Sequence, residues 1–151
     1  MAVFRMSNKR YGMKKELQVA EFLKNRGFRC RRSRGSRGPA DLVARNEQKG
    51  LYWLIQVKST RAHGDFASAF QRAIKAAPAL RRAAEARRIR CRSRDGGIVC
   101  RIRRFRPEWR TPVVAVVQGN YVWFFDVSGR DARLIMEGKL EELRGKYDEY
   151  P

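Results

Sequence analysis

The chain is poor in the residues that bind transition metals, and it lacks long apolar runs. Its 151 residues include one histidine, His63, and three cysteines, Cys30, Cys91 and Cys100. These residues do not have the paired, short spacings of a zinc site, so each cysteine is expected to be a small buried hydrophobe. No apolar stretch approaches the roughly 20 residues of a membrane span, and no signal peptide opens the sequence. We therefore expect a cytoplasmic protein with no membrane segment.

Acidic residues are also scarce, with 15 Asp and Glu against 35 Lys and Arg and a formal net charge of +20. Such an excess of cations implies a polyanionic partner, and arginine, which outnumbers lysine, binds phosphate through its planar fork. The hydrophobic content of 43% is too high for a disordered basic tail. A chain of this length is expected to form a single domain, residues 1–151. A structural RNA or DNA binder, or a solvated basic surface, would explain the charge equally well.

Two short strands carry the polar residues that most suggest chemistry. Ala40-Asp41-Leu42-Val43-Ala44 is an apolar run with one carboxylate, and residues 51–59 form a second run rich in β-formers. Side chains alternate along a strand, so Gln56 and Lys58 share one face while Val57 points to the other. A hairpin of these strands brings a carboxylate, an amide oxygen and an ammonium group to one end of a sheet. Such a set can hold a divalent cation and orient water against a phosphate.

A helix is predicted from residue 9 to residue 26, with Gly27 as its C-cap. Glu16 projects within the apolar arc of this helix, where a carboxylate needs a partner or a metal. One interpretation is an ion pair with one of the many arginines. The other is a role in an active site.

A half-buried strand, residues 28–33, leads into a loop rich in glycine, serine and arginine. The loop offers backbone N–H groups and guanidinium ions to a phosphate backbone. Its candidate DNA-binding residues, together with the end of the strand, are Arg32, Arg34 and Arg37.

The remaining elements complete an α/β fold. Residues 66–88 read as helical, with a kink or a second helix starting at Pro78. Apolar strands are predicted at 113–117 and 121–127, and a short charged helix at 140–147. With the strands at 28–33, 40–45 and 51–59, these elements predict a mixed five-stranded sheet flanked by helices.

The segment 89–104 is predicted to be an arginine-rich β-hairpin that turns at Asp95-Gly96. In this register Ile89 faces Ile102 and Cys91 faces Cys100. The other face of this hairpin would carry five arginines. Like charges on one face destabilise a ribbon unless a polyanion covers them, so the arginine face is interpreted as a DNA-binding surface. The alternative is that the preceding helix continues through residue 94. The predicted face comprises Arg90, Arg92, Arg94, Arg101 and Arg103.

The same register places Cys91 and Cys100 at a non-hydrogen-bonded pair, where side chains approach closely. Disulfides are rare in the cytosol, except in hyperthermophiles. The arginine bias fits an archaeal, hyperthermophilic source, in which this disulfide would be plausible.

The motif Pro39-Ala40-Asp41 followed by Gln56-Val57-Lys58 resembles the signature of the PD-(D/E)XK nuclease superfamily. Within it the chain looks most like the archaeal Holliday junction resolvases. The resemblance rests on the helix with an inward Glu16, the strand, the Ser/Gly loop, and Asp-Leu-Val-Ala leading to Val-Lys-Ser. It covers residues 9–60 well and 112–127 loosely. Gln56 departs from the family, which usually has Glu there.

The resemblance implies a restriction-endonuclease-like fold and a Mg²⁺ or Mn²⁺ cofactor. The metal would be held by Asp41, the Gln56 amide oxygen, the Val57 carbonyl and Glu16, the last directly or through water. Lys58 would orient the attacking water, and a loop serine, Ser33 or Ser36, would contribute to the site. The resemblance also favours a role for Glu16 in the active site over a simple ion pair.

The resemblance further implies a homodimer that cuts branched DNA at a four-way junction, without a small-molecule cofactor. Two other interpretations remain open. One is a catalytically silent nucleic-acid-binding module, favoured by Gln56, and the other is a repair or restriction nuclease acting on ordinary duplexes. A structural RNA-binding protein would explain the charge but not the pairing of Asp41 with Lys58.

Overall fold

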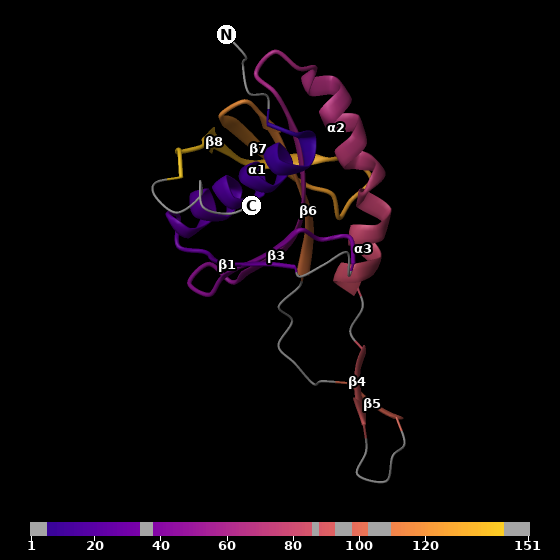
Figure 1. Cartoon of the computed structure of the whole chain (residues 1–151). Coiled ribbons are helices and arrows are strands. Elements are labelled where there is room, and N and C mark those ends of the chain that lie inside the picture. Colours follow the sequence, from indigo (N-terminus) through magenta and orange to yellow (C-terminus); the bar gives the residue numbers. More distant parts are fainter. Residues whose placement is uncertain (1–5, 34–37, 86–87, 93–97, 103–109, 144–151) are drawn as a thin grey trace.

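Six strands form one sheet through four antiparallel pairings and one parallel pairing (Figure 1). The computed structural model describes residues 6–33, 38–85, 88–92, 98–102 and 110–143, with the backbone alone at 88–92 and 98–102. The elements in chain order are α1 (Asn8–Lys24), β1 (Arg29–Arg32), β2 (Leu42–Asn46), β3 (Leu51–Thr60), α2 (Phe66–Lys75), α3 (Ala77–Glu85), β4 (Arg88–Arg92), β5 (Ile98–Ile102), β6 (Arg110–Gln118), β7 (Tyr121–Asp126) and β8 (Arg133–Lys139).

The strands lie in the order β1-β2-β3-β6-β7-β8, with β3 and β6 parallel at the centre. Helix α1 packs on one face of the sheet, where Leu23, Ile55 and Phe124 belong to one buried cluster. Helices α2 and α3 pack on the other face, where Leu54 and Leu80 belong to a second cluster. The predicted mixed α/β architecture, with helices on both faces of the sheet, is therefore present.

Helix α1 begins and ends close to the predicted residues. The Ser7 side chain accepts a hydrogen bond from the Arg10 N–H at its start. Gly27, with φ of 90°, lies just beyond its end, and the Gly27 and Phe28 N–H groups donate to the carbonyls of Lys24 and Leu23. This pair of bonds is a Schellman motif, which requires the left-handed conformation that glycine adopts without strain.

The prediction of five strands is wrong because the described part of the sheet has a sixth, β8. This edge strand pairs with β7 through an irregular register at Phe124 and Phe125, and most of its residues are exposed or half-buried. An edge strand of this kind lacks the strict apolar alternation by which strands are recognised in a sequence. The predicted helix at 140–147 is not formed at residues 140–143, and residues 144–147 lie outside the described chain.

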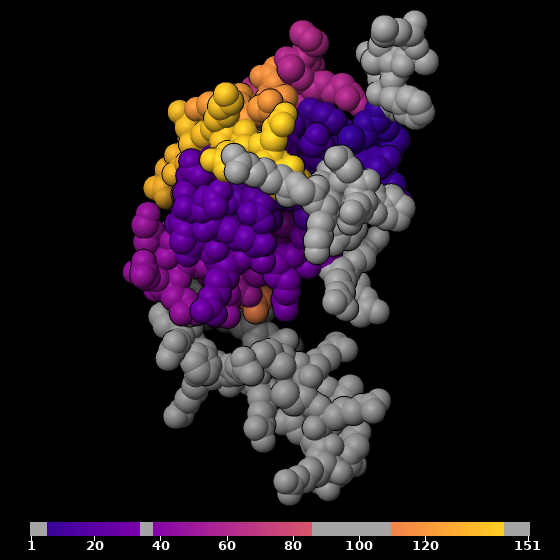
Figure 2. Space-filling model, turned by 60° about the vertical axis from the view of Figure 1, so that its left-hand side comes forward, coloured from indigo at the N-terminus to yellow at the C-terminus, as the bar shows by residue number. Residues whose placement is uncertain are grey.

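Leu140 is buried in the cluster on the α1 face, and its N–H donates to the Asn120 carbonyl at 2.6 Å. The next residue, Glu141, accepts a hydrogen bond from the buried Gln18 of α1. In the space-filling view the yellow C-terminal segment accordingly adjoins the purple N-terminal region (Figure 2). Leu140 and Glu141 are therefore held on the α1 side of the sheet and are not helical.

The helical region after β3 divides near the predicted position. Helix α2 ends at Lys75, and α3 begins at Ala77 with Pro78 as its second residue. Proline is tolerated in a first turn because the N–H that it lacks would have no helical partner there. None of the helices in the described ranges is long and apolar enough to cross a membrane.

The segment after α3 forms a two-stranded antiparallel sheet, β4 and β5, which Figure 1 draws apart from the main sheet. A helix continuing through residue 94 is therefore wrong. The register is shifted by one residue from the predicted one, since Cys91 pairs with Val99 and Arg90 pairs with Cys100. Directly paired positions share a face of a ribbon, so positions 90 and 101 are on opposite faces. The predictions of one face with five arginines and of a direct Cys91–Cys100 pair are therefore wrong.

Candidate active site

Asp41 lies where the pairing of β2 with β3 stops. Its N–H donates to the Ile55 carbonyl, and its side-chain Oδ2 accepts a hydrogen bond from the Val57 N–H, both at 2.8 Å. Strand β2 begins at Leu42, opposite Ile55, so β3 continues beyond it toward Thr60. The Asp41 carboxylate thus replaces a strand carbonyl as the partner of Val57, which holds the carboxylate at the end of the strand pair.

Val57 presents its backbone to Asp41 and its side chain to the core. The side chain belongs to the buried cluster on the α1 face. The N–H and C=O of one strand residue lie on the same side of the strand, so the Val57 carbonyl borders the same strand edge as Asp41. This carbonyl therefore lies beside the carboxylate, and its use as a metal ligand stays a prediction.

Glu16 approaches Asp41 from α1. Its Oε2 lies 3.4 Å from the Arg32 guanidinium, and its side chain is 23% exposed. Burial and the neighbouring Asp41 charge raise the pKa of Glu16, while Arg32 and Lys58 oppose that rise. The predicted ion pair between Glu16 and an arginine is thus present. A role for Glu16 in an active site stays open, because Glu16 also lies within electrostatic range of Asp41.

Burial also raises the pKa of the Asp41 carboxyl, against the Val57 hydrogen bond and the charges of Lys58 and Arg32. Glu16 and Asp41 are therefore two neighbouring, partly buried carboxyl groups whose charged forms are destabilised by their surroundings. A bound cation would relieve that destabilisation in both.

Gln56 and Lys58 share a face of β3, as the sequence predicts. Leu54 belongs to the cluster on the α2 and α3 face, and alternation puts Gln56 and Lys58 on the same face as Leu54. Both side chains are half-buried. The pairing of β2 with β3 begins at Leu42 and Ile55, and Asp41 precedes the first paired residue of β2. The structure therefore brings Glu16, Asp41 and Lys58 within electrostatic range of one another. Gln56 lies between Ile55 and Val57, whose backbone groups bind Asp41, and its side chain is on the face away from α1.

The predicted serines and arginines are only partly described. The Ser33 N–H donates to the Asp41 carbonyl at 2.9 Å, which places Ser33 beside the candidate site through its backbone. Ser36, Arg34, Arg37 and Arg103 lie outside the described residues, and Arg90, Arg92 and Arg101 are described by their backbone. The choice between Ser33 and Ser36 stays open.

The oxygen donors at this site suit a hard cation. Two carboxylates, an amide and a main-chain carbonyl are the ligand types that Mg²⁺ uses, usually with several waters retained. Within the described ranges no group of three or more His, Cys, Asp or Glu residues is placed to hold a metal. The donor types present are therefore those of a hard, oxygen-bound cation and not those of a soft transition metal.

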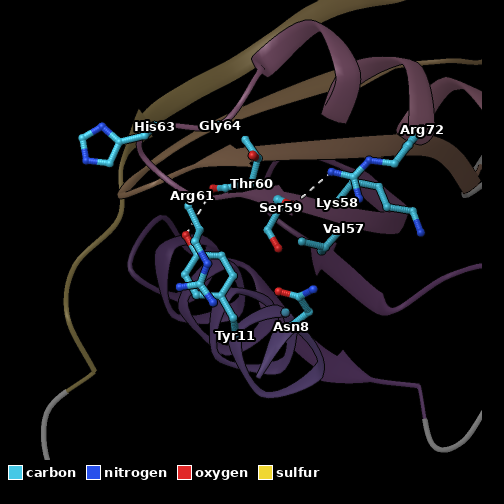
Figure 3. Close-up of a pocket in the computed structure, with 11 residues that line it drawn as sticks. Asn8, Tyr11, Val57, Lys58, Ser59, Thr60, Arg61, His63, Gly64 and Arg72 are labelled. Carbon is cyan, nitrogen blue, oxygen red and sulfur yellow. Dashed lines mark hydrogen bonds between the residues drawn. The ribbon is translucent and has the colours of Figure 1, made fainter. Parts of the chain in front are cut away.

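Sequence reasoning missed a set of residues next to Lys58. Lys58 also lines a pocket between α1, the end of β3 and α2, together with Tyr11, Arg61 and Arg72 (Figure 3). Neither Asp41 nor Glu16 is among the lining residues, so the pocket adjoins the carboxylates at Lys58 and does not contain them. These residues belong to separate elements and form no motif; the only signal available was the high arginine content.

The chain was compared with known proteins. No family model matches it, and the search of curated proteins gives no match. Among solved structures, it is similar to Hjc, a Holliday junction resolvase from the archaeal hyperthermophile Archaeoglobus fulgidus, with 18% identity, a TM-score of 0.43, and coverage of 85% of this chain and 84% of Hjc. It is also similar to the bacterial homing endonuclease I-Ssp6803I, with 16% identity, a TM-score of 0.40, and coverage of 96% and 88%. The function proposed below rests on the geometry of the site.

A first prediction concerns the stability of the site. Asp41→Asn is expected to raise the melting temperature at neutral pH, because asparagine keeps an oxygen for the Val57 N–H and removes a penalised charge. Since the folded-state pKa of Asp41 is raised, stability is lost as pH rises from the ordinary carboxyl range through the raised value. The gain should therefore vanish below the ordinary carboxyl pKa, where Asp41 is neutral in both states.

The difference in melting temperature between wild type and Asp41→Asn is measured by thermal unfolding across this pH range. In a chain of this size, each kcal/mol of stability changes the melting temperature by about 2–4 °C. Asp131→Asn, an exposed change in the turn before β8, is the matched control. A lower melting temperature for Asp41→Asn at neutral pH would contradict the prediction and make Asp41 a purely structural residue.

Proposed function

We propose that the protein is a metal-dependent, structure-selective DNA endonuclease of the Holliday junction resolvase kind. The observation that carries this proposal is the meeting of two carboxylates of raised pKa, Glu16 and Asp41, within range of Lys58. Asp41 is held there by the Val57 N–H. A net charge of +20 supplies the affinity for a polyanionic substrate.

Each residue has a distinct role in the proposed reaction. Asp41, Glu16, the Gln56 amide oxygen and the Val57 carbonyl would hold Mg²⁺ or Mn²⁺. When bound, such an ion acts as a Lewis acid toward the phosphate and lowers the pKa of water. Lys58 orients the attacking water and stabilises the charge that develops on the phosphate oxygens. Arg32 neutralises Glu16 when no cation is bound, since the two side chains are paired at 3.4 Å.

We further propose DNA with a four-way junction as the substrate and a homodimer as the active form. Symmetrical cleavage of a junction requires two active sites related by a two-fold axis, and a C2 dimer supplies them. Recognition of a branch would depend on shape and on the spacing of phosphates, which basic surfaces can read without contacting bases.

The decisive experiment incubates the purified protein with labelled four-way junction, linear duplex and single-stranded DNA, each with Mg²⁺, Mn²⁺ or EDTA. Paired, metal-dependent cuts in the junction alone are expected. Equal cleavage of linear duplex would instead indicate a repair or restriction nuclease. Binding to DNA without cleavage under every condition would overturn the proposal in favour of a silent binding module.

One observation specifically favours the silent module. Gln56 is an uncharged amide where the resembled family usually has a glutamate, which would leave the proposed metal site one negative charge short. Weaker metal affinity, or a requirement for Mn²⁺, is expected from that loss.

A second prediction concerns the β4–β5 ribbon and Arg103, the next residue after β5 in the sequence, whose arginines we propose to contact DNA. Replacing Arg90, Arg92, Arg101 and Arg103 with alanine should weaken DNA binding and flatten its salt dependence. Each duplex phosphate contact removed lowers the magnitude of the log K against log [salt] slope by about 0.9. Salt titrations of binding in EDTA measure this change.

A control with the same loss of charge substitutes four exposed cations on other elements: Lys24, Lys49, Lys75 and Arg130. A slope that falls equally in both quadruple variants would show a general charge effect and not a ribbon contact.

A further inference from the structure

The pocket beside Lys58 has a volume of about 570 Å³; it shares Val57 and Lys58 with the proposed active site and is not lined by Glu16 or Asp41. Its walls come from three separate elements, namely the start of α1, the end of β3 with the following loop, and α2 (Figure 3). Tyr11 belongs to α1, Arg61 to the loop after β3, and Arg72 to α2. Lys58 contributes to the pocket and lies within range of Asp41, so the pocket opens directly beside the candidate active site.

The charge of the pocket has one sign. Lys58, Arg61 and Arg72 line it, and no aspartate or glutamate is among its lining residues. Ser59, Thr60 and other lining residues add hydroxyl and backbone groups. A cavity with several cations and polar hydrogen-bond groups suits a phosphate group.

Both guanidinium groups are held in place by neutral acceptors. Arg61 donates through Nη2 to the Met6 carbonyl at 2.8 Å and lies 4.4 Å from the centre of the Tyr11 ring. Arg72 donates through Nη2 to the Ser59 carbonyl at 3.3 Å. A guanidinium has five N–H donors, so one carbonyl contact leaves others for a ligand. In the part of the chain that the structure describes, neither arginine forms an ion pair with a carboxylate, so both keep their charge for an anion.

The loop that carries Arg61 is tightly held. The Gly64 N–H donates to the Arg61 carbonyl at 2.7 Å, and the Gly64 carbonyl accepts from the Gln118 side chain at 2.9 Å. The Gly119 N–H donates to the Thr60 carbonyl at 3.0 Å. A Cβ atom at Gly64 would overlap the Thr60 side chain, so this turn requires glycine. A wall fixed in this way reduces the entropy that a ligand must overcome on binding.

We infer that this pocket binds the DNA backbone phosphate that neighbours the scissile one on the same strand, with Arg72 and Arg61 as its ligands. The inference rests on the proposed function. A strand that places one phosphate against Lys58 carries the next phosphate one nucleotide away, and the adjoining pocket offers two fixed cations to receive it. Engagement of two successive phosphates fixes the direction of the strand across Asp41, so Arg72 and Arg61 position the substrate and take no part in the chemistry.

Arg72→Ala provides the test, because Arg72 is exposed on α2 and its removal leaves the core intact. Lys75→Ala, an equal loss of charge on the same helix outside the pocket, is the matched control. In EDTA, Arg72→Ala should bind junction DNA about tenfold more weakly, the usual loss for one hydrogen bond to a charged group. Its salt slope should fall by about 0.9, as for one lost duplex phosphate contact. Arg72→Lys should retain the slope, and Lys75→Ala should match wild type.

The position of the phosphate is found by replacing single phosphates of the junction with uncharged methylphosphonates. A methylphosphonate at one position should weaken binding by the wild type but leave binding by Arg72→Ala unchanged. A methylphosphonate at a second position should weaken binding by the wild type but leave binding by Lys58→Ala unchanged. The two positions should be adjacent on one strand. Separated positions, or an Arg72→Ala variant that equals Lys75→Ala, would overturn the inference. Since binding is measured without metal, a protein that never cleaves DNA can still pass this test, and failure of the proposed function is distinguished from failure of the inference.

Discussion

Asp41→Asn and Lys58→Ala are each expected to slow phosphodiester cleavage by at least about 10²-fold, the usual effect of removing one preorganised electrostatic group. DNA binding should stay largely intact in Asp41→Asn and weaken by no more than about tenfold in Lys58→Ala, the loss of one contact between a charged group and a phosphate. Asp41 is held at the β2–β3 edge by the Val57 N–H and lies within range of Lys58. Removing its charge deprives a cation of an anionic ligand, whereas removing Lys58 takes away the group that stabilises charge on the phosphate. Neither change disturbs the buried clusters on which the sheet depends.

Single-turnover cleavage of a labelled junction measures the first effect, and binding in EDTA measures the second. Asp131→Asn and Lys75→Ala, both exposed and distant along the chain from β3, are controls for the loss of one charge of each sign. If both site variants lose binding as much as cleavage, Asp41 and Lys58 have a structural role and the nuclease proposal fails.

Gln56→Glu is expected to strengthen Mg²⁺ binding by about tenfold or more, because the affinity of oxygen-ligand sites follows the number of charged ligands. The substitution nearly conserves shape on a half-buried position, so the sheet should tolerate it. Cleavage in Mg²⁺ should rise with the affinity, and any preference for Mn²⁺ should diminish.

The metal affinity is measured without catalysis by the rise of the melting temperature as Mg²⁺ is added, since a ligand that binds only the folded state stabilises it. Gln56→Ala serves as the control for loss of the amide. No Mg²⁺-dependent shift in Gln56→Glu, together with no cleavage by either form in any metal, would identify a silent DNA-binding module.

Much of the fold could be predicted because its central elements have strong periodic patterns. Helix α1 has a broad apolar arc that ends at a glycine, and it forms between Ser7 and Gly27 as that pattern requires. The continuous apolar run of β6 is buried on both faces, where Val113 and Val114 belong to opposite clusters. The edge strand β8 was missed because a strand with one open side is under weaker compositional constraint.

The β4–β5 ribbon illustrates the limit of pattern reading in short hairpins. The turn residues indicated a hairpin, and strands do form on either side of residues 93–97. The register nevertheless differs by one residue from the predicted one, and a one-residue shift changes which positions share a face. A turn signal predicts that a hairpin forms but does not fix its loop length, and a change in loop length shifts the pairing of the strands.

For the site, the sequence by itself determined the local geometry along β3. Alternation places Gln56 and Lys58 on one face and Val57 on the other, whatever packs around them. It also determined that Asp41 follows a turn-rich loop directly before a buried strand.

Only the tertiary structure decided which distant residues join this set. The approach of Glu16 to Asp41, the pairing of Glu16 with Arg32, and the meeting of Arg61 and Arg72 beside Lys58 all depend on how α1 and α2 pack on the sheet. Burial of apolar side chains sets that packing, and apolar periodicity is visible in a sequence. The cations that the packing brings together carry no periodic signal, because an arginine is tolerated at almost any position that reaches solvent.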